Sequence, residues 1–247
     1  MWDWSAFLHY LHSWYLLKGA GVTLALSLAC LAIGLVCGTV AALMRMSAKP
    51  YLNKPAAFYI WLMRGTPVLV QLIIIYTGLP QLGIRFNVIE SCLLGLGLNE
   101  GAYLAEIIRA GILSVAKGQF DAARSVGMTH SMTMRIIVLP QAMRVIIPPL
   151  GNTFNSLLKT TSLASVISME ELLRRTEVLI QVQFKVLEIF IVAALYYLVM
   201  TTIWGFIQER LEVHFSRSHA PAKARGAAAT QNARAEIERV LLSHDAQ

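Results

Sequence analysis

The sequence predicts an all-α integral membrane protein with five transmembrane helices, and its composition and charge pattern carry this prediction. Hydrophobic residues make up 56% of the 247 residues and charged residues only 14%, and the mean hydropathy is +0.59. This is too apolar for an ordinary soluble domain. The basic residues, which give a formal net charge of +7, lie mostly between and after the apolar stretches, where they set the orientation of a membrane protein. That distribution argues against nucleic acid as a partner and predicts several passes through lipid.

Four apolar stretches have, or nearly have, the length of about 20 helical residues that crosses a bilayer core. They cover residues 19–44, 56–79, 88–113 and 187–209. A fifth stretch, at 141–167, contains Pro148, Pro149 and a polar run, and we expect a broken span there. Because lipid tolerates non-helical backbone only where protein or a water-filled cavity covers it, this break indicates a buried site.

The connecting segments predict the orientation. Residues 45–55 carry Arg45, Lys49 and Lys54, and residues 114–140 carry three basic residues and one acid. Since cytoplasmic loops are enriched in Lys and Arg, both segments are expected in the cytoplasm, with the N-terminus outside and the C-terminus inside.

The two ends of the chain differ from the spans. Residues 1–18 contain three Trp, two Tyr and one Phe, which predicts an interfacial segment on the outer membrane surface. Residues 211–247 are dominated by Ala, Arg and Ser and predict a disordered cytoplasmic tail with a short helix at 234–242.

Polar side chains inside the second and third spans mark candidate sites. Arg64 precedes Pro67, which cannot donate the hydrogen bond of a continuous helix, so we expect a kink. Arg64 either lines a translocation path or forms a structural pair in the bundle. Asn99 and Glu100 lie near the middle of the third span. Glu100 is expected to hold a polar or cationic ligand group, unless it pairs with Arg64 or Lys159.

Further polar groups lie in the same spans. Glu106 and Arg109 are three residues apart, which favours a local ion pair. The fifth stretch concentrates polar side chains at membrane depth, where transporters use unwound helices to hold charged small molecules. The alternative is a re-entrant turn whose polar groups satisfy one another. The candidates in this stretch are Asn152, Asn155, Ser156, Lys159, Thr160, Thr161 and Ser162.

Several catalytic motifs are missing from the sequence. No Gly-Lys dipeptide occurs, so the chain lacks a P-loop, and neither His-Glu-x-x-His nor Gly-x-Ser-x-Gly is present. We therefore expect no enzyme, no metal site and no cofactor on this chain. Uphill transport would then draw its energy from a partner or from an ion gradient.

The polar segment 121–140 resembles the EAA loop of the permeases of binding-protein-dependent ABC importers, with Asp at the position where Glu is usual. Met63–Gln71, Gly101–Gly111 and Leu139–Ser165 are similar to stretches of the polar amino acid permeases of that family, so the resemblance covers about residues 19–210. The residues that match the loop are Asp121, Ala122, Ala123, Gly127, Ile137, Leu139 and Pro140.

This resemblance implies the type I ABC importer permease fold, in the bacterial inner membrane. It implies a transmembrane subunit that takes a polar or charged amino acid, or a close derivative, from a periplasmic binding protein into the cytoplasm. The EAA loop would dock on cytoplasmic ATPase subunits, which bind ATP and Mg. A second permease subunit, identical or different, would complete the path through the lipid.

One position departs from the resemblance. Many such permeases carry an acidic or amide residue where this chain has Thr160, so Glu100 becomes the alternative partner for a cationic side chain. The alternative function is an ion-coupled secondary amino acid transporter.

Overall fold

The computed structural model describes residues 2–216, and every regular element in that range is helical. This confirms the all-α prediction. The elements are α1 (Trp4–Leu11), α2 (Trp14–Met46), α3 (Pro50–Gly65), α4 (Val68–Ile73), the π-helix η1 (Ile74–Gly78), the 3-10 helix η2 (Leu79–Leu82), α5 (Val88–Leu113), α6 (Lys117–Ser125), α7 (His130–Thr133), the π-helix η3 (Met134–Val138), α8 (Leu139–Thr160), the 3-10 helix η4 (Thr161–Ile167), α9 (Leu172–Gln183) and α10 (Val186–Ser216).

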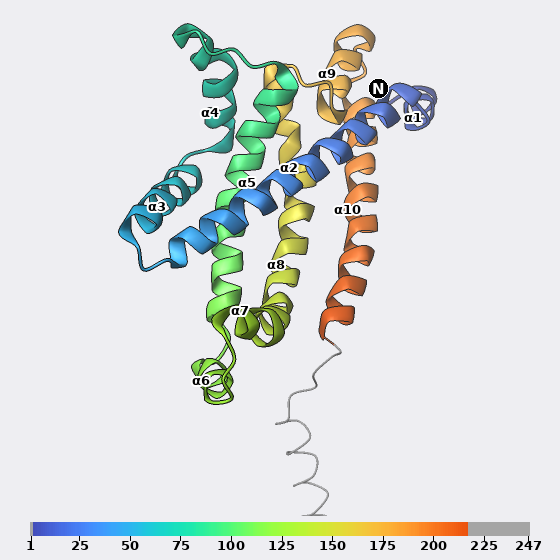
Figure 1. Ribbon diagram of the computed structural model, residues 1–247. Helices are drawn as coiled ribbons and strands as arrows, with labels where there is room; N and C mark the ends of the chain where they lie inside the picture. Colours follow the sequence, from blue (N-terminus) through green and yellow to red (C-terminus); the bar gives the residue numbers. More distant parts are fainter. Residues whose placement is uncertain (1, 217–247) are drawn as a thin grey trace, which may run out of the picture.

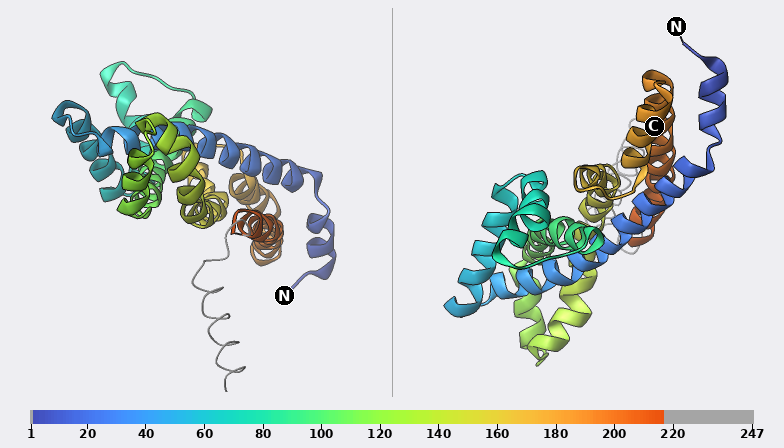
Figure 2. Two further views of the ribbon diagram at one scale, coloured as in Figure 1. Left: turned by 60° about the horizontal axis from the view of Figure 1, so that its bottom comes forward. Right: turned by 90° about the horizontal axis from the view of Figure 1, so that it is seen from above.

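The long helices form a bundle whose two ends carry different short helices. Figure 1 shows α5, α8 and α10 side by side with similarly tilted axes, the chain running in α8 opposite to α5 and α10, while α2 crosses them obliquely. The α6 and α7 helices lie at one end, and α1 and α9 at the other. Seen from above, α3 and α1 occupy opposite edges with α2 running between them (Figure 2). The predicted C-terminal tail lies outside the described residues from 217 onward, while residues 211–216 belong to α10.

Three helical segments of the described chain are long and apolar enough to cross a membrane: α2, the run 130–167, and α10. The run from α3 to η2 qualifies as a fourth only if it is counted as one bent span, because α3 and the segment Val68–Leu82 meet at 104°. The α5 helix has 26 residues, enough for about 39 Å at 1.5 Å per residue. It packs against both α2 and α8.

The expected break at 141–167 is wrong with respect to its prolines. Pro148 and Pro149 lie inside α8, which continues to Thr160 before it tightens into η4. Proline removes a hydrogen bond, but it holds φ near −65°, close to the helical value, so the chain can keep its helical path. The sharp break of the membrane region lies instead between α3 and α4, at Thr66 and Pro67.

Glycines bring α2 and α5 into backbone contact. A Cβ atom on Gly38 would lie 2.8 Å from the Gly101 carbonyl oxygen and 2.9 Å from Leu104 Cβ, and one on Gly34 would lie 3.2 Å from the Gly101 nitrogen. Gly34 and Gly38 therefore form the small-xxx-small surface that lets two membrane helices approach closely. This contact sets the distance of α5 from α2.

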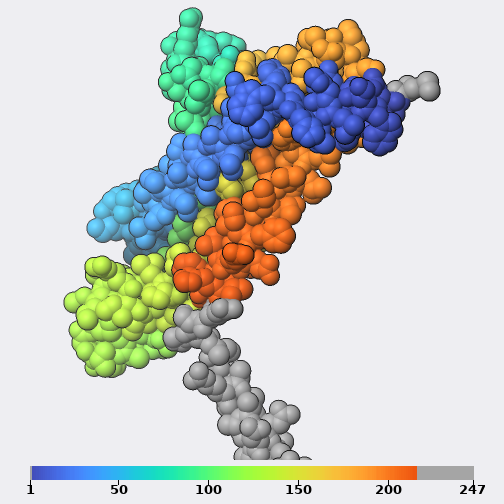
Figure 3. Space-filling view, turned by 90° about the vertical axis from the view of Figure 1, so that its right-hand side faces the viewer, coloured from blue at the N-terminus to red at the C-terminus, as the bar shows by residue number. Residues whose placement is uncertain are grey.

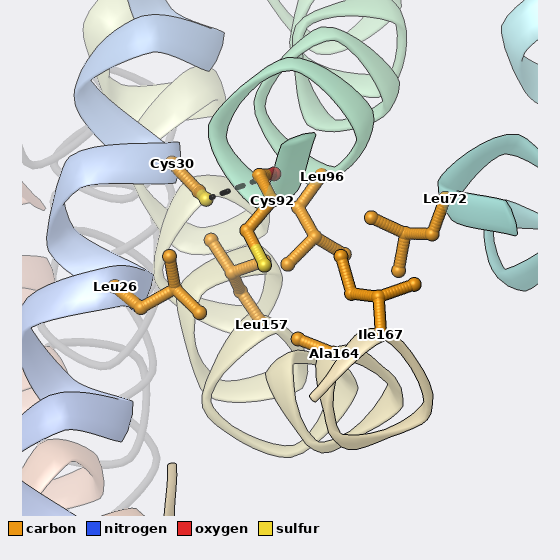
Figure 4. Close-up of a cluster of buried hydrophobic side chains, with 8 residues drawn as sticks. All are labelled: Leu26, Cys30, Leu72, Cys92, Leu96, Leu157, Ala164 and Ile167. Atoms are coloured by element: carbon orange, nitrogen blue, oxygen red, sulfur yellow. Dashed lines mark hydrogen bonds between the residues drawn. The ribbon is translucent and has the colours of Figure 1, made fainter. Parts of the chain in front are cut away.

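A core of apolar side chains joins α2 and α5 to the elements around them. Figure 4 shows side chains of α2, α4, α5, α8 and η4 converging. Cys30 and Cys92 are both free and buried, and the Cys30 thiol lies 3.9 Å from the Cys92 carbonyl oxygen. The cluster consists of Leu26, Cys30, Leu72, Cys92, Leu96, Leu157, Ala164 and Ile167.

A buried carboxylate ties the α9 end of the bundle together. Glu171 has no exposed surface and begins α9 by accepting hydrogen bonds from the Leu173 and Arg174 amides, at 2.9 and 2.7 Å. The Tyr197 hydroxyl of α10 also donates to it, at 3.0 Å. Burial raises the pKa of the Glu171 carboxyl, while these hydrogen bonds act in the opposite direction. The sequence offered no signal for this contact.

The N-terminal helix α1 packs on α10 and is held there by polar contacts. Asp3 caps α1 through the Ala6 amide, at 3.0 Å, and pairs with the Lys185 ammonium, at 2.9 Å. Figure 3 shows α1 lying at the upper end of α10. Leu198, Ile203 and other large apolar side chains of α10 are exposed, as expected for a surface that contacts lipid.

Replacing Gly38 by Ala should destabilise the protein by about 1–3 kcal/mol, because the added methyl group meets backbone atoms that cannot move aside. Replacing Gly21 by Ala on the same helix is the matched control, since a Cβ there has no atom within 4 Å. Alanine favours helix over glycine by about 1 kcal/mol, so Gly21→Ala should be neutral or stabilising. Thermal unfolding of the purified variants in detergent checks both, and equal melting temperatures would contradict close α2–α5 packing.

Candidate functional site

A cavity of about 910 Å³ lies between the α3–α4 break, α5 and α8. It is partly open, and its polar groups come from three separate parts of the chain. Arg64, Asn99, Glu100 and Thr160, all predicted from the sequence, lie in its wall. The polar residues that line it are Arg64, Thr66, Asn99, Glu100, Tyr103, Glu106, Thr153, Ser156 and Thr160.

The helix break between α3 and α4, at one wall of the cavity, results from the missing amide hydrogen of Pro67. In a continuous helix the Met63 carbonyl would accept the amide hydrogen of residue 67, but Pro67 has none. The side chain of Asn99 on α5 supplies the missing donor, with Nδ2 2.8 Å from the Met63 oxygen. Asn99 is almost fully buried, and its amide is thus engaged in holding the break. The kink predicted at Pro67 is confirmed.

Three charged side chains line the cavity in different environments. The Arg64 guanidinium lies 5.2 Å from the centre of the Tyr103 ring, an arrangement of the cation–π type. Glu106 forms an ion pair of 2.7 Å with Arg109, which confirms the predicted local pair. Among the described residues no hydrogen bond or ion pair engages the Glu100 carboxylate, so it pairs with neither Arg64 nor Lys159. Glu100 is thus the acid that the cavity leaves available.

The predicted site residues on α8 lie on two different faces of the helix. Ser156 and Thr160, both predicted from the sequence, lie in the cavity wall together with Thr153, which the prediction did not name. Positions 153, 156 and 160 share one helical face by their i, i+3 and i+7 spacing, so helical periodicity was the signal that could have found Thr153.

The remaining candidates of this region lie outside the cavity wall. Asn152 accepts a hydrogen bond of 3.1 Å from Gln208 on α10. Asn155 and the exposed Lys159 lie on the neighbouring face of α8. Thr161 is fully buried and donates to the Leu158 carbonyl at 3.1 Å, and Ser162 is half-buried in η4.

The proposed coupling segment forms a separate helical unit at the other end of α5. Asp121, Ala122 and Ala123 lie on α6, and of these only Ala123 is buried. Gly127 ends the helix with φ +78°, and the amides of Gly127 and Met128 donate to the Arg124 and Ala123 carbonyls at 2.9 and 3.0 Å. This is a Schellman motif. Ile137 lies in η3, and Leu139 and Pro140 begin α8.

The apolar helices and the cavity define a multi-pass membrane protein with a pocket lined by polar and charged side chains. The family model described as "Binding-protein-dependent transport system inner membrane component" matches residues 34–217. The chain is 41% identical over 202 residues to the probable amino-acid ABC transporter permease protein YckA of Bacillus subtilis (strain 168), which covers 82% of this chain and 89% of the relative. It is 38% identical to the glutamine transport system permease protein GlnP of Escherichia coli (strain K12), covering 80% and 91%.

A solved structure agrees with these relatives. The crystal structure of an amino acid ABC transporter with histidines contains a chain that is 38% identical and matches with a TM-score of 0.81, covering 87% of this chain and 99% of that one. The chain therefore belongs to the family of binding-protein-dependent transport system inner membrane components. Within it, the chain is a polar amino acid ABC transporter permease, a multi-pass protein of the bacterial inner membrane.

Replacing Glu100 by Gln should weaken the transport of a cationic amino acid, because the cavity then loses its unpaired carboxylate. A charge-assisted hydrogen bond is worth about 1.5–3 kcal/mol, so the half-saturating concentration should rise about tenfold or more in an uptake assay. Replacing Glu90 by Gln on the same helix is the matched control, since glutamine can keep the capping box that Glu90 forms with Asn87. An unchanged transport constant in the Glu100 variant would exclude direct contact with cargo.

Proposed function

We propose that this chain is the translocating subunit of an ATP-driven importer for a polar or charged amino acid delivered by a periplasmic binding protein. The observation that carries this proposal is the cavity, where an unpaired carboxylate and a guanidinium face the same space. A zwitterionic amino acid offers one ammonium and one carboxylate group to such a wall. Family membership supports the transport system to which the subunit would belong.

The direction of transport follows from a proposed topology of five spans. In this topology the five spans are α2, the bent pair from α3 to η2, α5, the run 130–167 and α10. The N-terminus lies outside and α6 lies in the cytoplasm. The basic residues near α3 and α6 support this orientation. The Asn99–Glu100 region of α5 would then lie within the membrane, and the α9 end would face the binding protein.

We further propose that α6 docks on a cytoplasmic ATPase that binds ATP and Mg. The small side chains of Ala122 and Ala123 permit close approach of a partner groove, and the Gly127 cap closes the helix within one turn. Closure of the ATPase on ATP would move α8 through the short segment that joins it to α6. A second permease subunit, identical or different, would cover the open side of the cavity.

Reconstitution of the permease with its ATPase and binding protein into proteoliposomes tests this function. We expect amino acid uptake that requires enclosed ATP and persists with an ionophore. Uptake that is insensitive to ATP depletion and abolished by the ionophore would instead establish ion-coupled secondary transport. Membrane insertion without any amino acid uptake would reject both.

Replacing Gly127 by Arg should abolish ATP-driven uptake while the permease still inserts into the membrane. A non-glycine residue in the left-handed region costs about 1–2 kcal/mol, and the added side chain blocks the docking surface next to α6. Replacing Gly83 by Arg is the matched control, because Gly83 has a similar φ of +84° and equally open surroundings in the loop before α5. Uptake and co-purification of the ATPase should fail only for the Gly127 variant. Normal uptake by that variant would refute the coupling role.

A further inference from the structure

The α3–α4 break is held by a second amide, Gln71 of α4. Its Nε2 atom lies 3.0 Å from the Met63 carbonyl oxygen, 2.7 Å from the Thr66 hydroxyl and 3.2 Å from the Thr66 carbonyl oxygen. Its Oε1 atom accepts a hydrogen bond of 3.1 Å from Asn99 Nδ2. One side chain therefore joins both sides of the break to α5. Here Gln71 and Asn99 together are called the amide clamp.

Arg64 lies between the two residues that the amide clamp holds. Met63 precedes it, and Gly65 and Thr66 follow it. Gly65 has no Cβ and open surroundings, so local sterics restrict this turn very little. Among the described residues, no hydrogen bond or ion pair engages the guanidinium, which lies 5.2 Å from the Tyr103 ring and interacts electrostatically with Glu106. The backbone at residue 64 therefore sets the point from which the Arg64 side chain reaches the cavity, where Tyr103 and Glu106 receive the guanidinium.

Gln71 makes more hydrogen bonds than the Met63 carbonyl requires. Asn99 alone satisfies the Met63 carbonyl, at 2.8 Å. The additional contacts of Gln71 reach Thr66, whose hydroxyl already donates to the Leu62 carbonyl at 2.8 Å and so can accept the Gln71 amide hydrogen. These bonds fix the turn on the far side of Arg64.

We infer that Gln71 is a positioning residue that holds the Arg64 guanidinium at the cavity, where it receives the carboxylate of the transported amino acid. The inference depends on the proposed function for the identity of the cargo. A guanidinium presents a rigid fork of donors that matches a carboxylate in two parallel hydrogen bonds, so its orientation matters more than that of a simple point charge. Gln71 acts on transport through Arg64 and does not itself contact cargo.

A double-mutant cycle in the reconstituted complex tests this assignment. Gln71→Met keeps the size of the side chain but removes its donor and acceptor, and it should lower maximal uptake about tenfold when Arg64 is present. In an Arg64→Ala background the same change should alter uptake by no more than about twofold, because its target is gone. Thr201→Val is the control, since it removes a side-chain hydrogen bond to the Tyr197 carbonyl on α10, away from the cavity. It should leave uptake unchanged.

Two results of the cycle would overturn the inference. Equal losses from Gln71→Met in both backgrounds would mean that Gln71 supports the bundle in general. Full uptake by Arg64→Ala would mean that the cargo does not need the guanidinium.

A labelling experiment that does not require transport provides the second measurement. Arg64→Cys, in a chain whose half-buried Cys37 is replaced by Ser, is treated with a cationic methanethiosulfonate reagent in the purified complex. Adding Gln71→Met should change the reaction rate of the new thiol about threefold or more, because the turn is released. An unchanged rate would overturn the positioning role. If Arg64→Ala imports no amino acid, the double-mutant cycle cannot be read, and the labelling rate is then the deciding measurement. If the unaltered complex fails to import amino acids with ATP, the proposed function fails while the labelling rate still reports on Gln71.

Discussion

The Met63 carbonyl is the group on which the arrangement of the cavity depends. A backbone carbonyl left without a donor in a bilayer costs several kcal/mol, and Pro67 leaves this one without its helical partner. Asn99 and Gln71 supply replacements from α5 and from the far side of the break, at 2.8 and 3.0 Å. The α3 and α4 segments can therefore meet at 104° and turn Arg64 toward a space between helices. The need to satisfy one oxygen atom thus couples a helix break to a polar site.

The glycine contact between α2 and α5 supports this arrangement. The Gly34 and Gly38 surface holds α5 at backbone distance, and the Tyr59 hydroxyl of α3 donates to the Leu98 carbonyl of α5, one residue before Asn99. The α5 helix thereby presents Asn99 to the break and Glu100 to the cavity from a fixed backbone. Two neighbouring polar residues take different roles because successive helical side chains point about 100° apart.

The two ends of the bundle are built by different means. At the α9 end, Glu171 joins α2, α9 and α10 through hydrogen bonds to its buried carboxylate, which makes this end a connected unit. At the α6 end, exposed Asp121 and Ala122 and the Gly127 cap leave a short helix that few contacts constrain. A rigid end and a projecting helix are what a protein needs if one end receives cargo while a partner moves the other.

Composition and local pattern by themselves determined the all-helical membrane class, the kink at Pro67 and the Glu106–Arg109 pair, because each depends on hydropathy or on residues within a few positions of one another. The motif in 121–140 likewise indicated the family. Only the tertiary structure decided that α8 continues through Pro148 and Pro149, and that Asn99 serves the backbone while Glu100 remains unpaired. It also decided that Thr153, Ser156 and Thr160 line the cavity while Asn152 and Lys159 lie outside its wall. Pro148 and Pro149 stay inside α8 because the φ of proline suits a helix. The roles of Asn99 and Glu100 and the lining of the cavity depend instead on which groups from distant parts of the chain lie close together, and the packing of helices far apart in sequence decides that.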